Sequence, residues 1–355
     1  MSDTLLEVRG LKTTFETPRG SVRVLDGLDL SVGRSRILGL VGESGSGKSV
    51  TAYSILRIVR PPGRVVGGHV IFEGRDLLSL SERAMRRVRG KEISMIFQDP
   101  RGFLDPVARV GDVLCEVIRT HEGASRREAR ERAGELFRSV GLPAPERVMR
   151  AYPHELSGGM AQRAMIALAL ACSPQLLIAD EPTTALDVTI QIQIVRLLAE
   201  LRAQLGLTIM LITHNLSLVA EICDEVAVMY AGEIVERGPA LELFERPLHP
   251  YSRALLEAVP VDSPAHRIER PLPRGEPYAA IDPGPGCRFA SRCPWAAREC
   301  EDPVELQEID ARRSVRCVGW LSVRVPAPAG PAAAPSPHLE PGERAGTTTG
   351  RRGDE

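Results

Sequence analysis

The sequence lacks the features that mark a membrane-spanning or exported protein. No apolar run reaches the roughly 18 residues needed to cross a bilayer. The first residues, MSDTLLEVRG, contain neither the basic segment nor the apolar segment of a signal peptide. We therefore expect the chain to be made and kept in the cytosol.

Several other signals are weak or missing. The formal net charge of the 355-residue chain is −1, so no basic excess indicates nucleic acid as a partner. Aromatic residues make up only 4% of the chain, while hydrophobic residues make up 43% and charged residues 26%, as in an ordinary globular protein. The seven cysteines should stay reduced in the cytosol, so we expect no disulfide framework. Cys115, Cys172 and Cys223 lie in apolar contexts and are expected to pack as small core residues.

The chain has three regions of different composition. Residues 1–260 alternate short β-rich runs, such as RILGLV and LTIMLIT, with longer helical segments, which predicts an α/β domain with a largely parallel sheet. Residues 261–324, the Cys-rich appendage, are rich in Pro, Gly, Arg and Cys. This segment cannot bury much apolar surface, so it would need another kind of stabilising link to fold. Residues 325–355 are rich in Pro, Ala and Gly, which predicts a disordered tail.

A glycine-rich motif at residues 42–49, GESGSGKS, fits the phosphate-loop pattern G-x-x-x-x-G-K-S/T. It follows an apolar run and precedes a helical one, so it lies at a strand-to-helix turn. We expect its backbone N–H groups to point at phosphate oxygens, Lys48 to neutralise the β- and γ-phosphates, and the Ser49 hydroxyl to ligate Mg²⁺. The expected nucleotide-binding residues of the motif are Gly42, Ser44, Gly45, Ser46, Gly47, Lys48 and Ser49.

Two carboxylates follow the apolar residues 176–179 in LLIADEPTTALD. A strand at 176–179 would end at the edge of the sheet that carries the phosphate loop, so Asp180 and Glu181 should emerge beside the nucleotide. We expect Asp180 to hold Mg²⁺ through its water shell. Glu181 should polarise the water that attacks the γ-phosphate, which predicts hydrolysis of the nucleotide.

A second glycine motif, LSGGMAQR, occupies residues 156–163. Ser157, Gly158 and Gly159 at a helix start would form another anion-binding nest, although the chain already has one for its own nucleotide. Two such sites in one chain imply that one is used in trans. With LSGG about 24 residues before Asp180, the sequence resembles the ATP-binding subunit of an ABC transporter. In that family two subunits dimerise head to tail, and each signature motif caps the ATP held by the other's phosphate loop.

The resemblance implies roles for four further residues. Gln98, after ISMIF, matches the Q-loop glutamine, which senses Mg²⁺ and the γ-phosphate. His214, after LTIMLIT, matches the switch histidine, which contacts the γ-phosphate and supports Glu181. Asp187 in ALD matches the D-loop, which acts across the dimer. Phe15 in LKTTF matches the aromatic residue that stacks on adenine, although an aromatic side chain there could equally pack in the core.

The resemblance also implies a fold. We expect an α/β protein with an ABC-type P-loop ATPase core, in which a mostly parallel sheet is joined by an antiparallel β subdomain and a helical signature subdomain at about residues 101–172. The stretches GESGSGKSV, AYPHELSGGMAQR and HPYSRALLEAVP, with the later cysteine patterns, resemble the oligopeptide/dipeptide branch of ABC importers from about residue 5 to about residue 320. Ala161 departs from that branch, which usually has a basic residue there, and we expect a small effect on helix-surface charge.

The implied function is that of an ATP-hydrolysing motor subunit of a multisubunit importer of di- or oligopeptides. The implied partners are a second related ATP-binding subunit in a heterodimer, two transmembrane permease subunits and an extracytoplasmic solute-binding protein, with the chain bound to the cytoplasmic face of the membrane. Nickel and glycosides stay open as cargo. A soluble, non-transport ABC ATPase is the less favoured alternative, because the chain has one cassette and no coiled-coil heptads.

Four cysteines lie in the appendage at positions 287, 293, 300 and 317, with five, six and sixteen residues between them. None forms the C-x-x-C pair typical of structural zinc. The wider spacing on an irregular backbone suits an iron–sulfur cluster on four thiolates, whose negative charge neighbouring arginines could offset. We therefore expect Cys287, Cys293, Cys300 and Cys317 to hold a 4Fe–4S cluster, with Zn²⁺ or unligated thiols as the alternatives.

Overall fold

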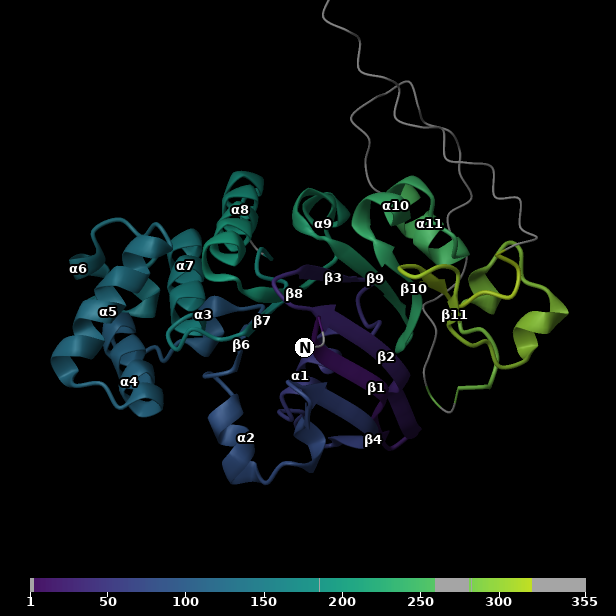
Figure 1. The fold of residues 1–355 in the computed structure, drawn as a ribbon, viewed down its shortest axis with the longest axis horizontal. Coiled ribbons are helices and arrows are strands. Elements are labelled where there is room, and N and C mark those ends of the chain that lie inside the picture. Colours follow the sequence, from purple (N-terminus) through teal and green to yellow (C-terminus); the bar gives the residue numbers. More distant parts are fainter. Residues whose placement is uncertain (1–2, 185, 259–280, 282, 321–355) are drawn as a thin grey trace, which may run out of the picture. The chain divides into compact units, whose positions relative to one another are not determined.

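The structure of the chain is a computed structural model that describes residues 3–184, 186–258, 281 and 283–320 (Figure 1). The described residues, all within 3–320, form one compact unit. The predicted disordered tail at 325–355 lies outside the described residues, and so does most of the predicted boundary between the ATPase domain and the appendage, at 259–280.

The larger of two sheets runs through the centre of this unit in the order β11-β12-β10-β9-β3-β8-β7-β6. From β9 to β6 every pair of neighbouring strands is parallel, and the strands from β9 to β11 pair antiparallel. In β3, β7 and β8 every residue is buried, as expected of parallel strands covered on both faces. The strands are β3 (Ile37–Val41), β6 (Ile93–Ile96), β7 (Leu176–Asp180), β8 (Thr208–Thr213), β9 (Glu225–Tyr230), β10 (Glu233–Pro239), β11 (Gln307–Glu308) and β12 (Ser314–Val315).

A four-stranded antiparallel sheet, in the order β2-β1-β4-β5, lies on the other side of helix α1 (Lys48–Ile55). Its strands are β1 (Thr4–Thr17), β2 (Gly20–Gly33), β4 (Gly63–Phe72) and β5 (Arg75–Asp76). One hydrophobic cluster joins buried residues of both sheets and α1, including Leu6, Ile55 and Ile178. The mostly parallel sheet and the antiparallel β subdomain are therefore both confirmed.

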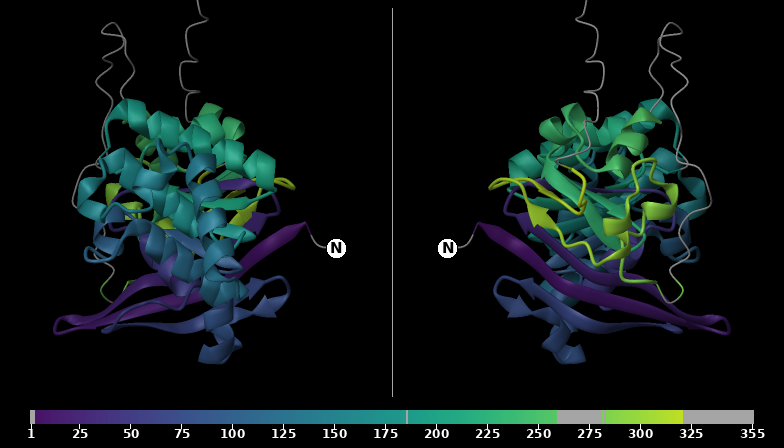
Figure 2. Two further views of the ribbon diagram at one scale, coloured as in Figure 1. Left: turned by 90° about the vertical axis from the view of Figure 1, so that its left-hand side faces the viewer. Right: turned by 90° about the vertical axis from the view of Figure 1, so that its right-hand side faces the viewer.

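The helices that follow β6 form a separate layer, coloured blue to teal in Figures 1 and 2. The sequence sets their ends: Ser125 and Glu128 form a capping box at the start of α5, and Gly123 ends α4 in the left-handed conformation. They are α3 (Pro100–Phe103), α4 (Val110–Glu122), α5 (Arg126–Ser139), α6 (Pro145–Val148) and α7 (Gly158–Ala169).

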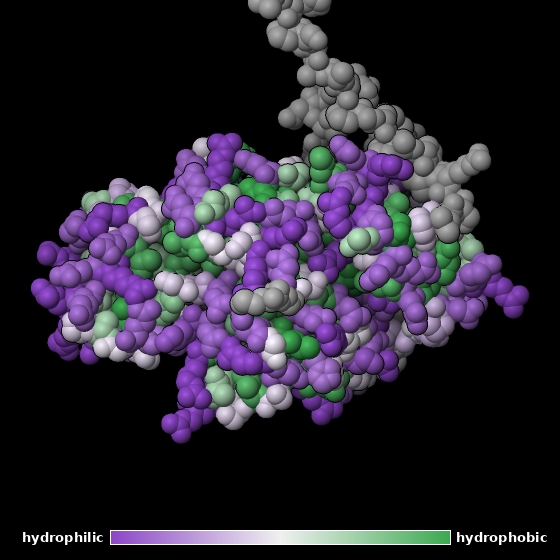
Figure 3. All heavy atoms as spheres, in the orientation of Figure 1, coloured by the Kyte–Doolittle hydropathy of each residue, from purple (hydrophilic) through white to green (hydrophobic). Residues whose placement is uncertain are grey.

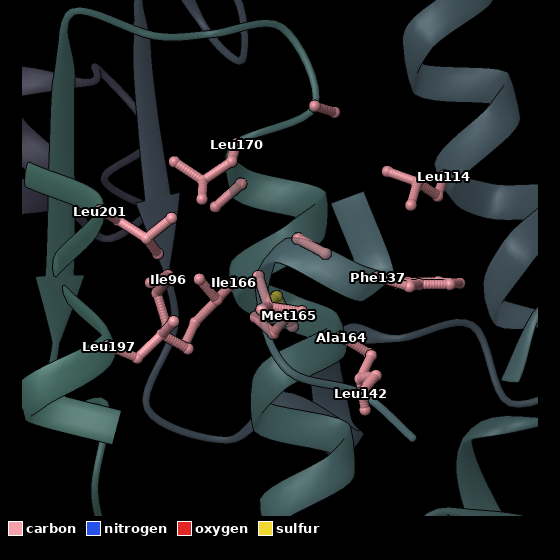
Figure 4. Close-up of a cluster of buried hydrophobic side chains, with 14 of the residues drawn as sticks. Ile96, Leu114, Phe137, Leu142, Ala164, Met165, Ile166, Leu170, Leu197 and Leu201 are labelled. Atoms are coloured by element: carbon pink, nitrogen blue, oxygen red, sulfur yellow. The ribbon is translucent and has the colours of Figure 1, made fainter. Parts of the chain in front are cut away.

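Helix α7 joins this layer to the sheet, because it is buried on two sides. In Figure 4 Ile166 lies toward Ile96 of β6 and Leu197 of α8 (Val188–Leu205), whereas Ala164 lies toward Leu142. All five residues belong to one cluster of buried side chains. A displacement of the helical layer would therefore be transmitted to the sheet through α7.

The remaining helices cover the sheet face opposite the antiparallel sheet, apart from α2 (Glu82–Val88), which precedes β6 (Figure 1). They are α8, α9 (Leu216–Ile222), α10 (Ala240–Glu245) and α11 (Pro250–Glu257). No helix among the described residues is long and apolar enough to cross a membrane. The face seen in Figure 3 is mainly hydrophilic, with small hydrophobic areas between.

The Cys-rich appendage packs directly on the α/β core. Its short strand β12 pairs with β10, and Phe289 joins a buried cluster with Tyr230 of β9 and Tyr251 of α11. Apart from β11 and β12, the described part of the appendage contains short 3-10 turns at Ala290–Arg292 and Arg298–Glu301. The predicted irregular backbone is thus observed, anchored at the edge of the larger sheet.

Candidate functional site

The phosphate loop at residues 42–49 connects β3 to α1, and two of its glycines have no room for a side chain. At Gly42 (φ 157°) a Cβ would lie 2.2 Å from the carbonyl oxygen of Met229. At Gly47 (φ 107°) it would lie 2.8 Å from Cε of Met229 and 3.0 Å from the oxygen of Val24. The loop is therefore pressed against β9 and β2, a close approach that only glycine permits.

The tip of the loop is open to solvent, while its second half is buried. Ser44 and Gly45 are exposed at the turn, whereas Ser46 is buried and its carbonyl oxygen accepts a hydrogen bond from the N–H of Gly232 at 2.8 Å. Lys48 is also buried, and its Nζ donates to the carbonyl oxygens of Gly42 and Glu43, each at 2.9 Å. The loop thus holds its curled form in this structure through its own lysine and the neighbouring strands.

Burial shifts the ionisable groups behind the loop. It lowers the pKa of Lys48, while the carboxylates of Glu181, Asp180 and Glu43 act in the opposite direction. Burial also raises the pKa of Asp180 to about 6; the nearby charge of Glu181 adds to this, and Ser49 and Lys48 oppose it. Both shifts have the same cause, because a charged form is disfavoured when it leaves water.

Asp180 and Ser49 meet at the end of β7, as predicted. The Ser49 hydroxyl donates to Oδ1 of Asp180 at 3.0 Å. The other carboxylate oxygen, Oδ2, is buried and has no hydrogen-bond partner. A buried carboxylate oxygen without a partner, beside a hydroxyl group, is a donor set of the kind that Mg²⁺ takes in phosphate-loop proteins, so these residues fit the expected metal.

Glu181 is held by three side chains from three loops. Its Oε2 accepts hydrogen bonds from Nε2 of Gln98 and from the hydroxyl of Thr184, each at 2.9 Å, and its Oε1 lies 3.2 Å from Nδ1 of His214. The structure therefore brings together the three predicted catalytic residues, Glu181, Gln98 and His214. Thr184 was not among the predicted residues, although it lies three positions after Glu181 in LLIADEPTTALD.

The backbone of Glu181 is also unusual. Its φ of 45° lies in the left-handed region, which costs a residue with a side chain about 1–2 kcal/mol. The N–H of Glu181 donates to the carbonyl oxygen of Ile212 in β8 at 2.8 Å, which fixes the residue in this conformation. Such strain concentrates at functional sites, where the surrounding structure over-determines one residue.

The signature residues lie at the start of α7. Ser157 is the N-cap, and its hydroxyl accepts the N–H of Met160 at 3.3 Å. A Cβ on Gly158 would lie 3.2 Å from Leu186, and one on Gly159 would lie 3.1 Å from Ile190. These contacts are with α8 and the segment before it, so within the described chain the signature residues are not hydrogen-bonded to their own phosphate loop.

Three further predicted positions complete the comparison. Asp187 is exposed at the start of α8 and does not cap that helix with its side chain. Phe15 is half-buried, and its ring lies 2.5 Å from where a Cβ of Gly63 would be, so the aromatic ring packs on β4. The expectation for Ala161 was wrong. Its side chain is fully buried in the hydrophobic cluster that contains α7, so this position does not lie on the helix surface.

The four cysteines of the appendage line one cavity of about 310 Å³, together with His249, Phe289 and Trp295. All seven cysteines of the chain are free thiols. Burial raises the pKa of Cys287 to about 11 and raises those of Cys293 and Cys317. Among the described residues no group of three or more His, Cys, Asp or Glu side chains is placed to hold a metal ion as it stands, so the expected iron–sulfur cluster has no direct support.

Two residues outside the predicted set contact the phosphate loop. The hydroxyl of Tyr251 in α11 accepts the N–H of Glu43 at 2.8 Å. The guanidinium of Arg292, which directly precedes Cys293, contacts the Glu43 carboxylate at 2.9 and 3.3 Å. From the sequence, the arginines next to the cysteines were expected only to offset the charge of a cluster, and no motif indicates a contact between the appendage and the phosphate loop.

Comparisons with known proteins identify the family of the chain. Residues 25–184 match the ABC transporter family, and residues 235–300 match the C-terminal region of oligopeptide/dipeptide transporters. A probable peptide ABC transporter ATP-binding protein of Sinorhizobium fredii is 51% identical over 91% of this chain and 97% of its own length. The oligopeptide transport ATP-binding protein OppD of Salmonella typhimurium is 46% identical over 89% of this chain and 94% of its own length.

Solved structures resemble the ATPase core. An ATP-binding cassette solved as a dimer bound to ADP and Pi has a TM-score of 0.60 and 26% identity, covering 66% of this chain and 98% of its own. The structure of cbiO1 from Clostridium perfringens has a TM-score of 0.58 and 28% identity, covering 68% of this chain and 91% of its own. The chain belongs to the ABC transporter family, in its oligopeptide/dipeptide branch, and is an ATP-hydrolysing subunit that works with membrane permease subunits.

Proposed function

We propose that Glu181 is the general base of ATP hydrolysis and that the surrounding side chains aim its carboxylate at the attacking water. The observation that carries this proposal is the convergence of Gln98, His214 and Thr184 on Glu181. A carboxylate fixed in this way can accept a proton from water without first reorganising. His214, whose side chain is 63% exposed, can also turn toward the γ-phosphate.

The phosphate loop would bind the α- and β-phosphates with its backbone N–H groups, and Lys48 would leave its two carbonyl partners to neutralise the β- and γ-phosphates. Asp180, Ser49 and Gln98 would hold Mg²⁺, directly or through water. When bound, that ion neutralises charge on the phosphate oxygens. Phe15 would stack on adenine from the end of β1, a role supported by its half-exposed ring alone.

The signature residues Ser157, Gly158 and Gly159 would act on the nucleotide of a second subunit, together with Asp187. Among the described residues, the Ser157 hydroxyl caps its own helix and forms no hydrogen bond with the phosphate loop, which supports action in trans, and so does the dimeric state of a solved relative. We propose that the second subunit is a related but different ATP-binding chain, so that the pair is a heterodimer.

The proposed cargo is a di- or oligopeptide, because the similar proteins of Sinorhizobium fredii and Salmonella typhimurium carry peptide transport in their names. In this proposal an extracytoplasmic solute-binding protein delivers the peptide to the permease subunits. In the same proposal the chain itself is bound to the cytoplasmic face of those subunits.

We also propose that the cavity lined by Cys287, Cys293, Cys300 and Cys317 takes an iron–sulfur cluster. The support is that four thiols surround one space, although they are not gathered as ligands of a single ion. An iron–sulfur cluster occupies the space between its four thiolates and keeps their sulfur atoms well apart. A single Zn²⁺ ion instead requires the four sulfur atoms to lie close to one another. Anaerobic purification with iron, sulfide and zinc analysis tests this: stoichiometric zinc in a colourless protein would contradict it.

Peptide uptake tests the transport proposal. Cells or proteoliposomes that contain the complete transporter should take up a labelled oligopeptide in an ATP-dependent manner, and Lys48→Ala in this chain should stop uptake. A matched assay with labelled nickel and glycoside should show no transport. ATP-dependent uptake of one of those solutes, without peptide uptake, would overturn the proposed cargo while leaving the ATPase assignment intact.

A further inference from the structure

The Cys-rich appendage contacts the phosphate loop through an ion pair between a largely buried arginine and a half-buried glutamate. Nη1 of Arg292 lies 2.9 Å from Oε2 of Glu43, and Nη2 lies 3.3 Å from Oε1, so the guanidinium faces both carboxylate oxygens. The side chain of Arg292 is 9% exposed and that of Glu43 is 33% exposed. The contact to Glu43 raises the pKa of Arg292, as expected for a partly desolvated cation that meets a carboxylate.

Glu43 is the second residue of the loop, and its backbone fixes the loop's shape. Its carbonyl oxygen accepts the N–H of Ser46 at 3.2 Å and Nζ of Lys48 at 2.9 Å. Its own N–H donates to the hydroxyl of Tyr251 at 2.8 Å. A shift of Glu43 would therefore displace the loop backbone and the resting position of Lys48 together.

Contacts with two aromatic side chains restrict the conformation of Arg292. Its guanidinium lies 5.8 Å from the ring centre of Tyr230 and 5.9 Å from that of Phe289, and Nη1 also donates to the Tyr230 hydroxyl at 3.3 Å. These contacts order the long side chain, so little conformational entropy remains to be lost when it pairs with Glu43.

The backbone on either side of Arg292 is tied to the cysteines. The N–H of Ala290 donates to the carbonyl oxygen of Cys287 at 3.0 Å, and the N–H of Cys293 donates to that of Ala290 at 3.2 Å. The N–H of Cys287 in turn donates to Cys300 at 2.8 Å. These backbone hydrogen bonds fix the segment 287–293, and so they fix the position from which Arg292 reaches Glu43.

We infer that Arg292 is a positioning residue for ATP binding: acting through Glu43, it holds the phosphate loop in its nucleotide-binding form, so the appendage is part of the nucleotide site. The inference rests on the proposed role of residues 42–49 as that site. Without Arg292, Glu43 loses the cation that fixes its side chain, and the loop loses part of its preorganisation. The effect should appear in nucleotide affinity before it appears in the chemical step.

A double-mutant cycle on the purified full-length chain tests the inference, with the dissociation constants of ATP and ADP as readouts. Arg292→Met keeps an unbranched apolar stem but removes the guanidinium and its charge, and should raise both constants about tenfold, the equivalent of one charge-assisted hydrogen bond. Glu43→Gln should have a similar effect. The double variant should be no worse than the poorer single variant, because both changes break the same contact.

Two further variants separate positioning from anchoring. Arg313→Met breaks another buried ion pair of the appendage, with Glu236 at 2.9 Å, and should lower the melting temperature without changing nucleotide affinity. Arg292→Lys keeps the charge without the two-pronged contact and should fall between wild type and Arg292→Met. It also carries the test if the methionine variant does not fold.

The outcomes are distinct. Additive effects in the cycle, or an Arg292→Met protein that binds ATP within twofold of wild type, would overturn the inference and leave the ATP site as proposed. A folded wild-type chain that binds no ATP would instead overturn the assignment of the loop itself.

Discussion

Gln98 donates a hydrogen bond to Glu181 at 2.9 Å, although 83 residues separate them in the sequence. Gln98 follows β6, the edge strand beside the helical layer, and Glu181 follows β7, the next strand of the sheet. A displacement of the helical layer against the sheet would thus act on the proposed catalytic carboxylate directly. We expect such a displacement when the permease subunits change conformation.

Thr184 should support catalysis through the same carboxylate. Thr184→Val removes the hydroxyl that donates to Oε2 of Glu181 and should lower kcat of the assembled transporter about tenfold, the cost of one hydrogen bond to a charged group. The dissociation constant of ATP should stay unchanged. Thr184→Ser keeps the hydroxyl and should restore most of the rate; a serine variant as slow as the valine variant would show that the hydroxyl is not the cause.

The glycines of the phosphate loop should differ in their tolerance of alanine. Gly42→Ala would place a Cβ 2.2 Å from the carbonyl oxygen of Met229, which should cost about 3 kcal/mol in the free energy of unfolding. Gly45 has a φ of 82° but no atom within 4 Å of its Cβ position, so Gly45→Ala should cost only about 1 kcal/mol of backbone strain. Urea denaturation measures both, and equal losses would contradict the close packing of Gly42 on β9.

Buried His249 should make stability depend on pH. Its Nδ1 accepts the backbone N–H of Tyr251 at 3.0 Å, which requires the neutral ring. Burial lowers the pKa of His249 to about 3, while Arg316 has two opposing effects on it. The backbone N–H of His249 donates to the carboxylate of Glu236. A depressed folded-state pKa means that this stability is present above the ordinary value of 6.5 and is lost as the pH falls toward 3.

His249→Asn keeps a helix-capping acceptor but cannot titrate. Between pH 6 and pH 4 the free energy of unfolding of the wild-type chain should fall about 1.4 kcal/mol per pH unit more steeply than that of the variant. Parallel pH profiles of the two proteins would mean that His249 is not neutral and buried in solution.

Much of the site could be predicted because its residues lie in short contiguous stretches at strand ends. The phosphate loop and the Asp180–Glu181 pair follow apolar strands, and parallel strands bring their carboxyl ends to one edge. Gln98 and His214 came only from the family resemblance, since a lone polar residue after a strand carries little information. Their contact with Glu181 depends on the strand order β8-β7-β6, which no local pattern reveals.

The errors and omissions have physical causes as well. Ala161 was expected on the helix surface because the branch that the sequence resembles usually has a basic residue there, and the sequence does not show how α7 is buried in the fold. The pair of Arg292 and Glu43 spans 249 residues and joins an irregular segment to a loop, so neither periodicity nor spacing predicts it. Contacts of this kind depend on how the appendage packs on the core.

The central claim is that Glu181 activates the water that hydrolyses ATP, and single-turnover hydrolysis by the Glu181→Gln variant in the assembled transporter tests it most directly. Glutamine keeps the size and one acceptor oxygen of the carboxylate, but its amide cannot take a proton. We predict that ATP binds with wild-type affinity, that the hydrolysis rate falls at least about a hundredfold, and that a closed, ATP-bound dimer accumulates. Hydrolysis at a rate close to that of the wild type would contradict the account.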